Sequence, residues 1–409
     1  MSTATTWSYK ARDTSGKIVK GKLDAGSEAA AIARMRSLGL APVQLQEGSG
    51  TGLNQDITFG GLLEKKVTLK DLAVMARQMS TMVGAGLSLL KTLTILADQT
   101  ENPKLAKTLG EVRNAVESGD ALSVALAKHP LIFPPLMIHL IRSGETGGFL
   151  DKALLSIADT FEADVKLRST IKSAMTYPVI VLVIALIAII AMLTFIVPIF
   201  ETMFADLGGA LPLPTQILVV ISKQMYWLAP AIIIGTVAFV IWWGRNKHTE
   251  KVRKVVHPWL LKLPVFGPLV GKIAIARFAR NFATMTSSGV PILQALGIVG
   301  ETSGNWVIEN ALHKVQDAVR TGKSIAGPLA LEPVFPSMVT QMIAVGEDSG
   351  SLEQMLDKIA DFYEDEVQAT TEQLTALIEP LLIAFLGVVV GGMVVALYLP
   401  VFSIFEQIK

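Results

Sequence analysis

The chain has 409 residues, enough for two or three domains, and a formal net charge of +1, so its composition predicts no nucleic-acid partner. It contains no cysteine, which excludes disulfides, thiolate catalysis and cysteine-ligated zinc. Hydrophobic residues make up 51% and charged residues 17%, against about 25% charged residues in a typical soluble domain. The shortage of charge is confined to a few long stretches, so we expect a mainly α integral membrane protein.

The chain begins with a predicted small α+β module over residues 1–46. Its predicted elements are strands over 7–11 and 18–23, a helix over 27–38 with Ser27 as N-cap, and a last strand over 42–45. The first 20 residues hold no apolar signal segment, so we expect the N-terminus to stay in the cytoplasm. Residues 47–66 are rich in glycine and predict a linker.

The remainder of the chain contains an internal repeat. The matched positions are Arg77 with Arg280, Gly86 with Gly289 and, after a single-residue gap, Gly144 with Gly346. Apolar residues at spacings of three and four predict about six helices in each copy. We therefore expect a first cytoplasmic helical bundle over 67–172 and a second, homologous one over 245–375.

Three stretches lack charged side chains and exceed the about 20 residues that cross a bilayer core. They predict transmembrane helices over 173–200, 217–244 and 376–402. Pro178 and Pro198 lie one bilayer thickness apart along a helix, and so do Pro380 and Pro400. We interpret each proline pair as marking the two edges of a span; a kink near each end is the alternative.

Charge predicts the orientation of these spans. Lysine and arginine are frequent just before the first span and between Gly244 and Arg280, whereas the loop 201–216 carries Glu201 and Asp206 but no basic residue. Because basic residues mark the cytoplasmic side, the first and third spans should run outward and the second should return. The loop 201–216 and the tail 403–409 are then external.

One motif, Gly-Glu-x-x-Gly-x-Leu, occurs in both copies. Its members are Gly144, Glu145 and Gly148 in the first copy, and Gly346, Glu347 and Gly350 in the second. Each glutamate precedes a long amphipathic segment, so we expect it to lie near the N-terminus of that helix and to stabilise its macrodipole. A cation site with Asp151 or Glu353, or a contact with a partner, is the alternative.

No residue pattern predicts catalysis or a cofactor. Thr321-Gly322-Lys323-Ser324 lacks the upstream glycine of a phosphate-binding loop, and the histidines show no metal-ligand spacing. The span centres carry no ionisable residue, which disfavours a membrane transporter. Gly387 and Gly391 in the third span permit close helix packing within the chain, on another subunit or on another membrane protein.

Taken together, the residues resemble the inner-membrane platform proteins of type IV pilus and type II secretion machines, the PilC/GspF family. The resemblance rests on the duplicated segment around Arg77 and Arg280, the paired glycine–glutamate motif and the segment 263–269, Leu-Pro-Val-Phe-Gly-Pro-Leu. The N-terminal residues 9–13 and 39–43 are also similar to that family. Residues 77–79 resemble the pilus branch more than the secretion branch.

The resemblance implies a non-enzymatic protein of the cytoplasmic membrane. Its cytoplasmic bundles would contact a hexameric assembly ATPase, and its membrane helices would contact pilin or pseudopilin subunits and other inner-membrane assembly proteins. It would form a homo-oligomer. We therefore expect a platform protein of type IV pilus assembly, with the type II secretion F protein as the alternative.

Overall fold

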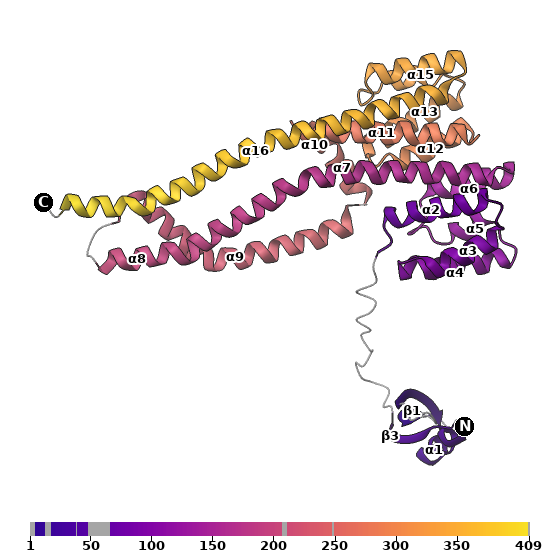
Figure 1. Ribbon diagram of the computed structural model, residues 1–409, viewed down its shortest axis with the longest axis horizontal. Helices are drawn as coiled ribbons and strands as arrows, with labels where there is room; N and C mark the ends of the chain where they lie inside the picture. Colours follow the sequence, from indigo (N-terminus) through magenta and orange to yellow (C-terminus); the bar gives the residue numbers. More distant parts are fainter. Residues whose placement is uncertain are drawn as a thin grey trace. The chain divides into compact units, whose positions relative to one another are not determined.

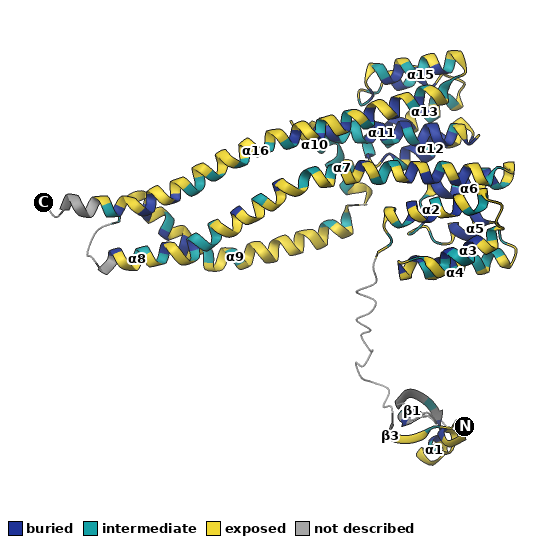
Figure 2. Ribbon diagram, in the orientation of Figure 1, coloured by how far each residue is buried: buried dark blue, intermediate teal, exposed yellow. Residues whose placement is uncertain are grey.

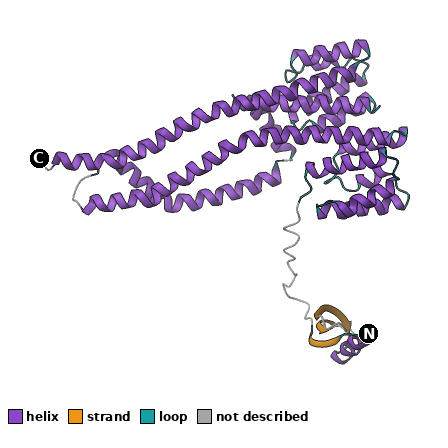
Figure 3. Cartoon of the chain, in the orientation of Figure 1, coloured by secondary structure: helices purple, strands orange, loops and turns teal. Residues whose placement is uncertain are grey.

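The computed structural model describes residues 5–12, 18–37, 39–47, 66–206, 211–247 and 249–407. The chain falls into two compact units, Met1–Glu64 and Lys65–Lys409. Most of the predicted linker, the turn at 13–17 and the last two residues lie outside the described residues. Figure 3 shows that helices form nearly all of the second unit, whereas the strands lie in the first.

The N-terminal unit is an antiparallel sheet with one helix. Its elements are β1 (Thr5–Arg12), β2 (Ile18–Ala25), α1 (Glu28–Ser37) and β3 (Ala41–Glu47), with strand order β2-β1-β3. The Ser27 hydroxyl accepts a hydrogen bond from the Ala30 N–H, which confirms the predicted N-cap. The β1–β3 register shifts at Ala11, which lies opposite Pro42, a residue without an N–H to donate.

The first copy of the repeat forms six helices in a bundle, as predicted, and continues towards the membrane. Its elements are α2 (Leu69–Gly84), α3 (Leu89–Gln99), α4 (Pro103–Glu117), α5 (Leu122–Ala127), α6 (Pro135–Gly147), α7 (Leu150–Ala191), the π-helix η2 (Met192–Ile196) and α8 (Val197–Asp206). Leu72, Met75 and Met79 are buried on one face of α2, which their helical spacing predicts.

The second copy repeats this plan after a return helix. The return helix is α9 (Leu213–Asn246). It is followed by α10 (Glu250–Lys262), α11 (Phe266–Ser287), α12 (Ile292–Thr302), α13 (Trp306–Arg320), α14 (Ala326–Ala330), α15 (Ser337–Ser349) and α16 (Leu352–Gln407). Buried side chains from both bundles form one continuous hydrophobic core. The two copies therefore fold together.

The last helix of each bundle is also its membrane helix. α16 has 56 residues and runs without a break through Pro380 and Pro400. α7 has 42 residues, contains Pro178 and continues through η2 and α8. The prolines therefore do not begin or end helices. Figure 1 shows both long helices leaving their bundles in the same direction, with α9 beside them.

Among the described residues, three helices are long and apolar enough to cross a membrane: those containing residues Leu150–Phe204, Leu213–Asn246 and Leu352–Phe402. Figure 2 shows that their distal parts are largely exposed, whereas the bundle helices have buried faces. The exposed side chains of α9 include Ile233, Val237 and Ile241. Apolar side chains exposed at this density require a lipid environment or other protein.

Candidate functional site

The first candidate site lies where the three long helices meet, beside a π-helix. Pro198 has no N–H, and the helix before it widens into η2, in which the Val197 N–H donates to the Met192 carbonyl. In this pattern the Leu193 carbonyl would receive its hydrogen bond from residue 198, which cannot donate. The hydroxyl of Ser222, buried on α9, donates to that carbonyl at 2.6 Å.

At the repeat-related proline, Pro400, α9 again donates a side-chain hydrogen bond to a backbone carbonyl. Pro400 cannot donate the usual helical hydrogen bond to the Ala396 carbonyl, four residues earlier. The hydroxyl of Thr215, also buried on α9, donates to that carbonyl instead. Thr215 and Ser222 are seven residues apart, two helical turns, so they lie on one face of α9. α9 therefore donates hydrogen bonds to carbonyls of both other long helices, the one formed by α7, η2 and α8 and the one formed by α16.

Two further contacts hold this junction. Leu193, Val197, Val219, Met393 and Leu397 form a buried apolar cluster from all three helices. Lys223 of α9 forms an ion pair with Glu201 of α8 at 2.7 Å. Sequence reasoning missed both the hydroxyls and this ion pair; the available signal was a pair of polar residues on one face of an apolar helix.

Each motif glutamate accepts hydrogen bonds from the N-terminus of a short helix, α5 or α14, and not from the long helix that the sequence predicted. Glu145 lies in the last turn of α6, and its carboxylate accepts hydrogen bonds from the Leu122 and Ser123 N–H groups at 2.5 and 3.2 Å. Glu347 accepts from Ile325 and Ala326 at 2.6 and 2.8 Å. The expected interaction with the N-terminus of the following long helix is thus wrong.

The physical reason is that α5 and α14 are short and that their N-cap residues, Ala121 and Ile325, make no side-chain cap hydrogen bond. Their first N–H groups need an acceptor, and a carboxylate meets both the hydrogen-bond demand and the helix dipole. The glutamate therefore joins two helices that are separated in sequence. Within the described residues, no group of three or more His, Cys, Asp or Glu could hold a metal ion.

The motif glycines lie where α6 meets α7 and where α15 meets α16. Gly144 and Gly346 do not break a helix, since both lie buried inside α6 and α15. A Cβ on Gly144 would lie 2.7 Å from the Ala153 Cβ, and one on Gly346 would lie 2.9 Å from the Leu352 Cα. The next helix therefore packs directly against the glycine backbone.

The break itself falls at the second motif glycine. Gly148 and Gly350 adopt left-handed φ angles of 75° and 70°, which end α6 and α15. Gly86 and Gly289 follow α2 and α11 with φ angles of 86° and 67°. These four positions favour glycine because other residues are strained there.

The repeated arginines brace the helix pair that leads to the membrane. Arg77 of α2 contacts Asp159 and Glu162 of α7. Arg280 of α11 contacts Asp357, Asp361 and Glu364 of α16 at 3.1, 2.6 and 3.0 Å. Hydrogen bonds with Glu162 and Asp159 raise the pKa of Arg77. For Arg280, burial opposes the charge, but the hydrogen bonds outweigh it and also raise its pKa.

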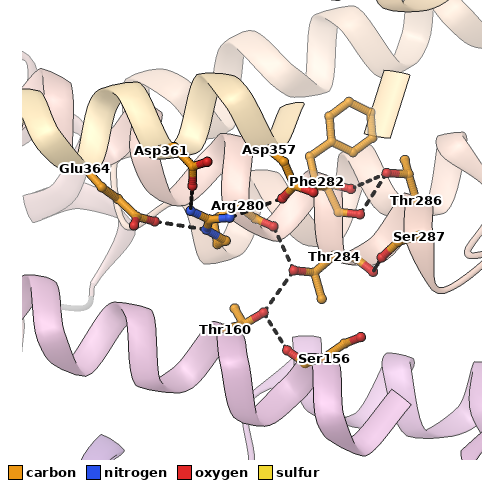
Figure 4. A network of polar contacts seen from close by, with 11 residues as sticks. Ser156, Thr160, Arg280, Phe282, Thr284, Thr286, Ser287, Asp357, Asp361 and Glu364 are labelled. Atoms are coloured by element: carbon orange, nitrogen blue, oxygen red, sulfur yellow. Dashed lines mark hydrogen bonds and ion pairs between the residues drawn. The ribbon is translucent and has the colours of Figure 1, made fainter. Parts of the chain in front are cut away.

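A polar chain connects this second brace to the first copy (Figure 4). The Thr284 hydroxyl lies 2.9 Å from both the Arg280 carbonyl and the Thr160 hydroxyl, and Thr160 lies 2.8 Å from the Ser156 carbonyl. Each hydroxyl has one hydrogen, so one threonine donates to its own helix and the other donates across the interface. The two copies are thus hydrogen-bonded at a buried position.

A cavity of about 180 Å³ opens between the copies beside this chain. Its charged lining includes Asp164, Arg168, Arg277, Arg280 and Glu364. Arg168 and Arg277 both pair with Asp164, and Arg280 pairs with Glu364. Each arginine therefore has a carboxylate partner, and two of the three share Asp164.

The remaining predicted residues lie in the membrane helices. Pro178 is inside α7 and buried, and Pro380 is inside α16. A Cβ on Gly387 or Gly391 would meet no atom within 4 Å, and both glycines are exposed. Neither glycine therefore packs against another helix among the described residues.

Comparison with known proteins follows the repeat closely. The family model described as type II secretion system (T2SS), protein F matches residues 75–198 and 278–400, and the model of that protein's N-terminal domain matches residues 3–46. The two repeat matches end at matched prolines, Pro198 and Pro400.

Several curated relatives match over almost their whole length. The type IV pilus assembly protein PilC of Myxococcus xanthus is 45% identical over 98% of this chain and 95% of that protein. The protein of the same name from Thermus thermophilus is 43% identical over 97% and 98% of the two chains. The type II secretion system protein F of Xanthomonas campestris is 31% identical over 98% of each.

Proposed function

The chain belongs to the type II secretion system protein F family, and from that premise we propose that it is the inner-membrane platform protein of a type IV pilus assembly machine. Relatives named for pilus assembly are 35–45% identical, against 30–33% for relatives named for type II secretion. The difference in identity favours the pilus role over the secretion role.

The observation that carries the proposal is the continuity of α7 and α16. Each of these helices begins inside a bundle and ends in an apolar segment suited to a membrane. A push on either bundle moves the attached membrane helix directly, because no loop intervenes. A continuous helix suits a protein that transmits force.

In this proposal both bundles face the cytoplasm and the chain ends outside. The basic residues between α9 and α11, such as Lys251, Arg253 and Lys254, support this orientation. The domain boundaries proposed from sequence fit it, with bundles over 67–172 and 245–375 and spans over 173–200, 217–244 and 376–402.

The proposed partners follow from the two ends of each long helix. The bundles would bind a hexameric assembly ATPase, and the exposed apolar faces of the spans, with Gly387 and Gly391, would contact pilin subunits or other membrane components of the machine. The chain itself would act without catalysis, as part of a homo-oligomer.

The test combines a genetic and a biochemical measurement. Deletion of the gene should abolish surface pili, and the wild-type gene supplied in trans should restore them. The purified chain in proteoliposomes should hydrolyse no ATP alone and should bind the assembly ATPase of its own host. Intact pili with a loss of secreted enzymes in the deletion strain would favour the secretion role. ATP hydrolysis by the purified chain alone would contradict the proposal.

A further inference from the structure

The helix α10 connects the return helix α9 to the second bundle. α9 ends at Asn246 and α10 begins at Glu250, and a chain segment of that length spans at most about 14 Å. Trp242 and Arg245, near the end of α9, are exposed and belong to residue types that are typical of a membrane–water interface. The start of α10 therefore lies close to the basic edge of a membrane helix.

The other end of α10 lies beside the other two membrane helices. α11 begins at Phe266, and its Leu269 packs with Leu167 of α7 and Leu374 of α16, just before the uncharged stretches of these helices. Further along α11, Arg280 contacts carboxylates that precede Leu374 in α16. α11 therefore runs from the edge of the apolar region into the bundle, and its first turn lies at that edge.

Both ends of α10 are thus close to the ends of membrane helices, which places α10 along the membrane surface. Its axis makes an angle of 117° with that of α11, and α11 packs along α16. α10 has 13 residues, so it is about 20 Å long. Lys251, Arg253 and Lys254 make it unsuitable as a part of a further span.

One face of α10 is fixed to the second bundle. Arg253 pairs with Glu309 of α13 at 2.5 Å, and the His257 Nδ1 accepts the hydrogen bond from the Trp306 N–H. Arg253 and His257 are four residues apart and therefore lie on the same face of the helix. The opposite face points away from α13.

That opposite face combines lysines with exposed apolar side chains. Its exposed members follow helical spacings of three and four: Lys251, Lys254, Val255, Trp259 and Lys262. Val255 and Trp259 are 70% and 62% exposed. Among the described residues, none of these three lysines forms an ion pair. α10 contains one acidic residue, Glu250, so the face has a surplus of positive charge.

The turn after α10 adds two apolar side chains at the same edge. Val265 has a φ angle of 88°, which is strained for a β-branched residue, yet Val265 and Phe266 are both exposed. A Cβ on Gly267 would overlap the Leu261 carbonyl oxygen, so the turn is tight as well as strained. A strained turn that exposes apolar side chains fits a segment that binds a partner.

We propose that α10 and the turn that follows it bind the surface of a bilayer that contains acidic phospholipids. The apolar side chains, with Trp259 among them, enter the headgroup region, and the lysines contact lipid phosphates. The occupant is lipid because both ends of the segment adjoin membrane helices and because its unpaired lysines complement a negatively charged leaflet. The inference rests on the membrane placement within the proposed function and adds a lipid-binding surface that holds the second bundle against the membrane.

Quenching of a fluorescent label by nitroxide-labelled lipids tests this contact, and the natural chain has no cysteine that would interfere. Full-length Val255→Cys carries an environment-sensitive fluorophore in phosphatidylcholine nanodiscs. These nanodiscs contain a small, equal fraction of either nitroxide-labelled phosphatidylglycerol or nitroxide-labelled phosphatidylcholine. We expect the labelled phosphatidylglycerol to quench about fivefold more strongly, the preference that one lysine near a membrane surface provides. Equal quenching by the two lipids would contradict the recognition of acidic lipid.

A charge variant tests the role of the lysines. Lys251→Gln, Lys254→Gln and Lys262→Gln together should remove most of the preference for phosphatidylglycerol, while the thermal unfolding of the protein remains. An unchanged preference in this variant would show that the lysines do not bind the lipid and would contradict the proposed surface.

Two further labelled positions separate this inference from the proposed function. Ile233→Cys, exposed within α9, should be quenched by both lipids. Val124→Cys, exposed on α5 at the end of the bundle where Glu145 caps that helix, should be quenched by neither. If the Ile233 label is quenched and the Val255 label is not, the inference is overturned and the proposed function stands. If the Ile233 label is not quenched, the membrane placement within the proposed function fails.

The emission of the label identifies a different occupant. A Val255 label that is shielded from water, yet quenched by neither lipid, would show that protein covers this face of α10. That result would also overturn the proposal.

Discussion

The two copies of the repeat differ in a consistent way. Both keep the motif glycines that let two helices pack closely, the glutamate that caps a distant short helix, and a proline preceded by a backbone carbonyl, that of Leu193 or Ala396, which accepts a hydrogen bond from α9. They differ on their outer surfaces, where Arg277 stands opposite Val74 in the alignment and Thr160 opposite Phe362. Duplication has thus preserved the frame that leads to the membrane and changed the surfaces that the frame presents.

The largest expected loss of stability concerns the two capping glutamates, which both copies share. Glu145→Ala and Glu347→Ala should each leave two helix N–H groups without their acceptor, at a cost of about 1–3 kcal/mol for a buried unsatisfied group. Thermal unfolding of the purified protein measures the effect. Glu→Gln at each position is the matched control, because it keeps one acceptor oxygen and should cost less. A large loss in one copy with none in the other would break the equivalence of the two capping sites.

The arginine braces should separate the copies. The Arg280 side chain is 22% exposed and contacts three carboxylates, whereas Arg77 is 36% exposed and contacts two. We expect Arg280→Ala to destabilise the protein by about 1–3 kcal/mol, since it leaves partly buried carboxylates unpaired. Arg77→Ala should cost about 0–1 kcal/mol, as exposed pairs do. Equal losses in chemical denaturation would show that burial does not distinguish the braces.

The proline sites are best examined with a double-mutant cycle. Ser222→Ala removes the donor to the Leu193 carbonyl and should cost about 1 kcal/mol, the size of hydrogen bonds between membrane helices. Pro198→Ala supplies a backbone N–H and should reduce that cost. Thr215→Val with Pro400→Ala is the matched cycle in the other copy. Additive losses in both cycles would argue against α9 as the donor that completes these helices.

A smaller effect distinguishes the copies by pH. In the first copy the helix α4 begins with Pro103, which has no N–H, whereas the matching Trp306 of α13 donates its N–H to the His257 Nδ1 at 2.9 Å. Burial, aided by Arg253 and opposed by Glu309, lowers the pKa of His257 below its usual 6.5. The folded state thus favours the neutral ring.

Stability from this contact is therefore present above pH 6.5 and is lost as the pH falls through the lowered pKa. His257→Asn keeps an acceptor that does not titrate, so it should flatten part of the acid decline in melting temperature. The remaining decline should include His139, whose pKa is lowered by burial and by Arg142. If the melting temperatures of His257→Asn and of the natural chain depend on pH in the same way, protonation of His257 does not contribute to the acid decline.

Much of this architecture was predictable because its causes are local. The apolar stretches, the breaks at Gly86 and Gly289 and the repeated helices follow from composition and spacing. The motif identified Glu145 as a candidate residue. Its hydrogen-bond partners could not be predicted, because they lie in a helix 22 residues upstream. The contacts of Ser222 and Thr215 join helices 29 and 181 residues apart, a pairing that spacing cannot indicate.

The most direct test of the central claim is the side of the membrane on which each bundle lies. Asn114 and Asp317 are matched, exposed positions of the two bundles, and Leu213 is exposed at the start of α9. Single cysteines at these positions can be labelled with an impermeant maleimide in spheroplasts. Leu213→Cys should label in intact spheroplasts, and Asn114→Cys and Asp317→Cys only after lysis. Labelling of exactly one bundle position before lysis would place the bundles on opposite faces and contradict the shared direction of α7 and α16.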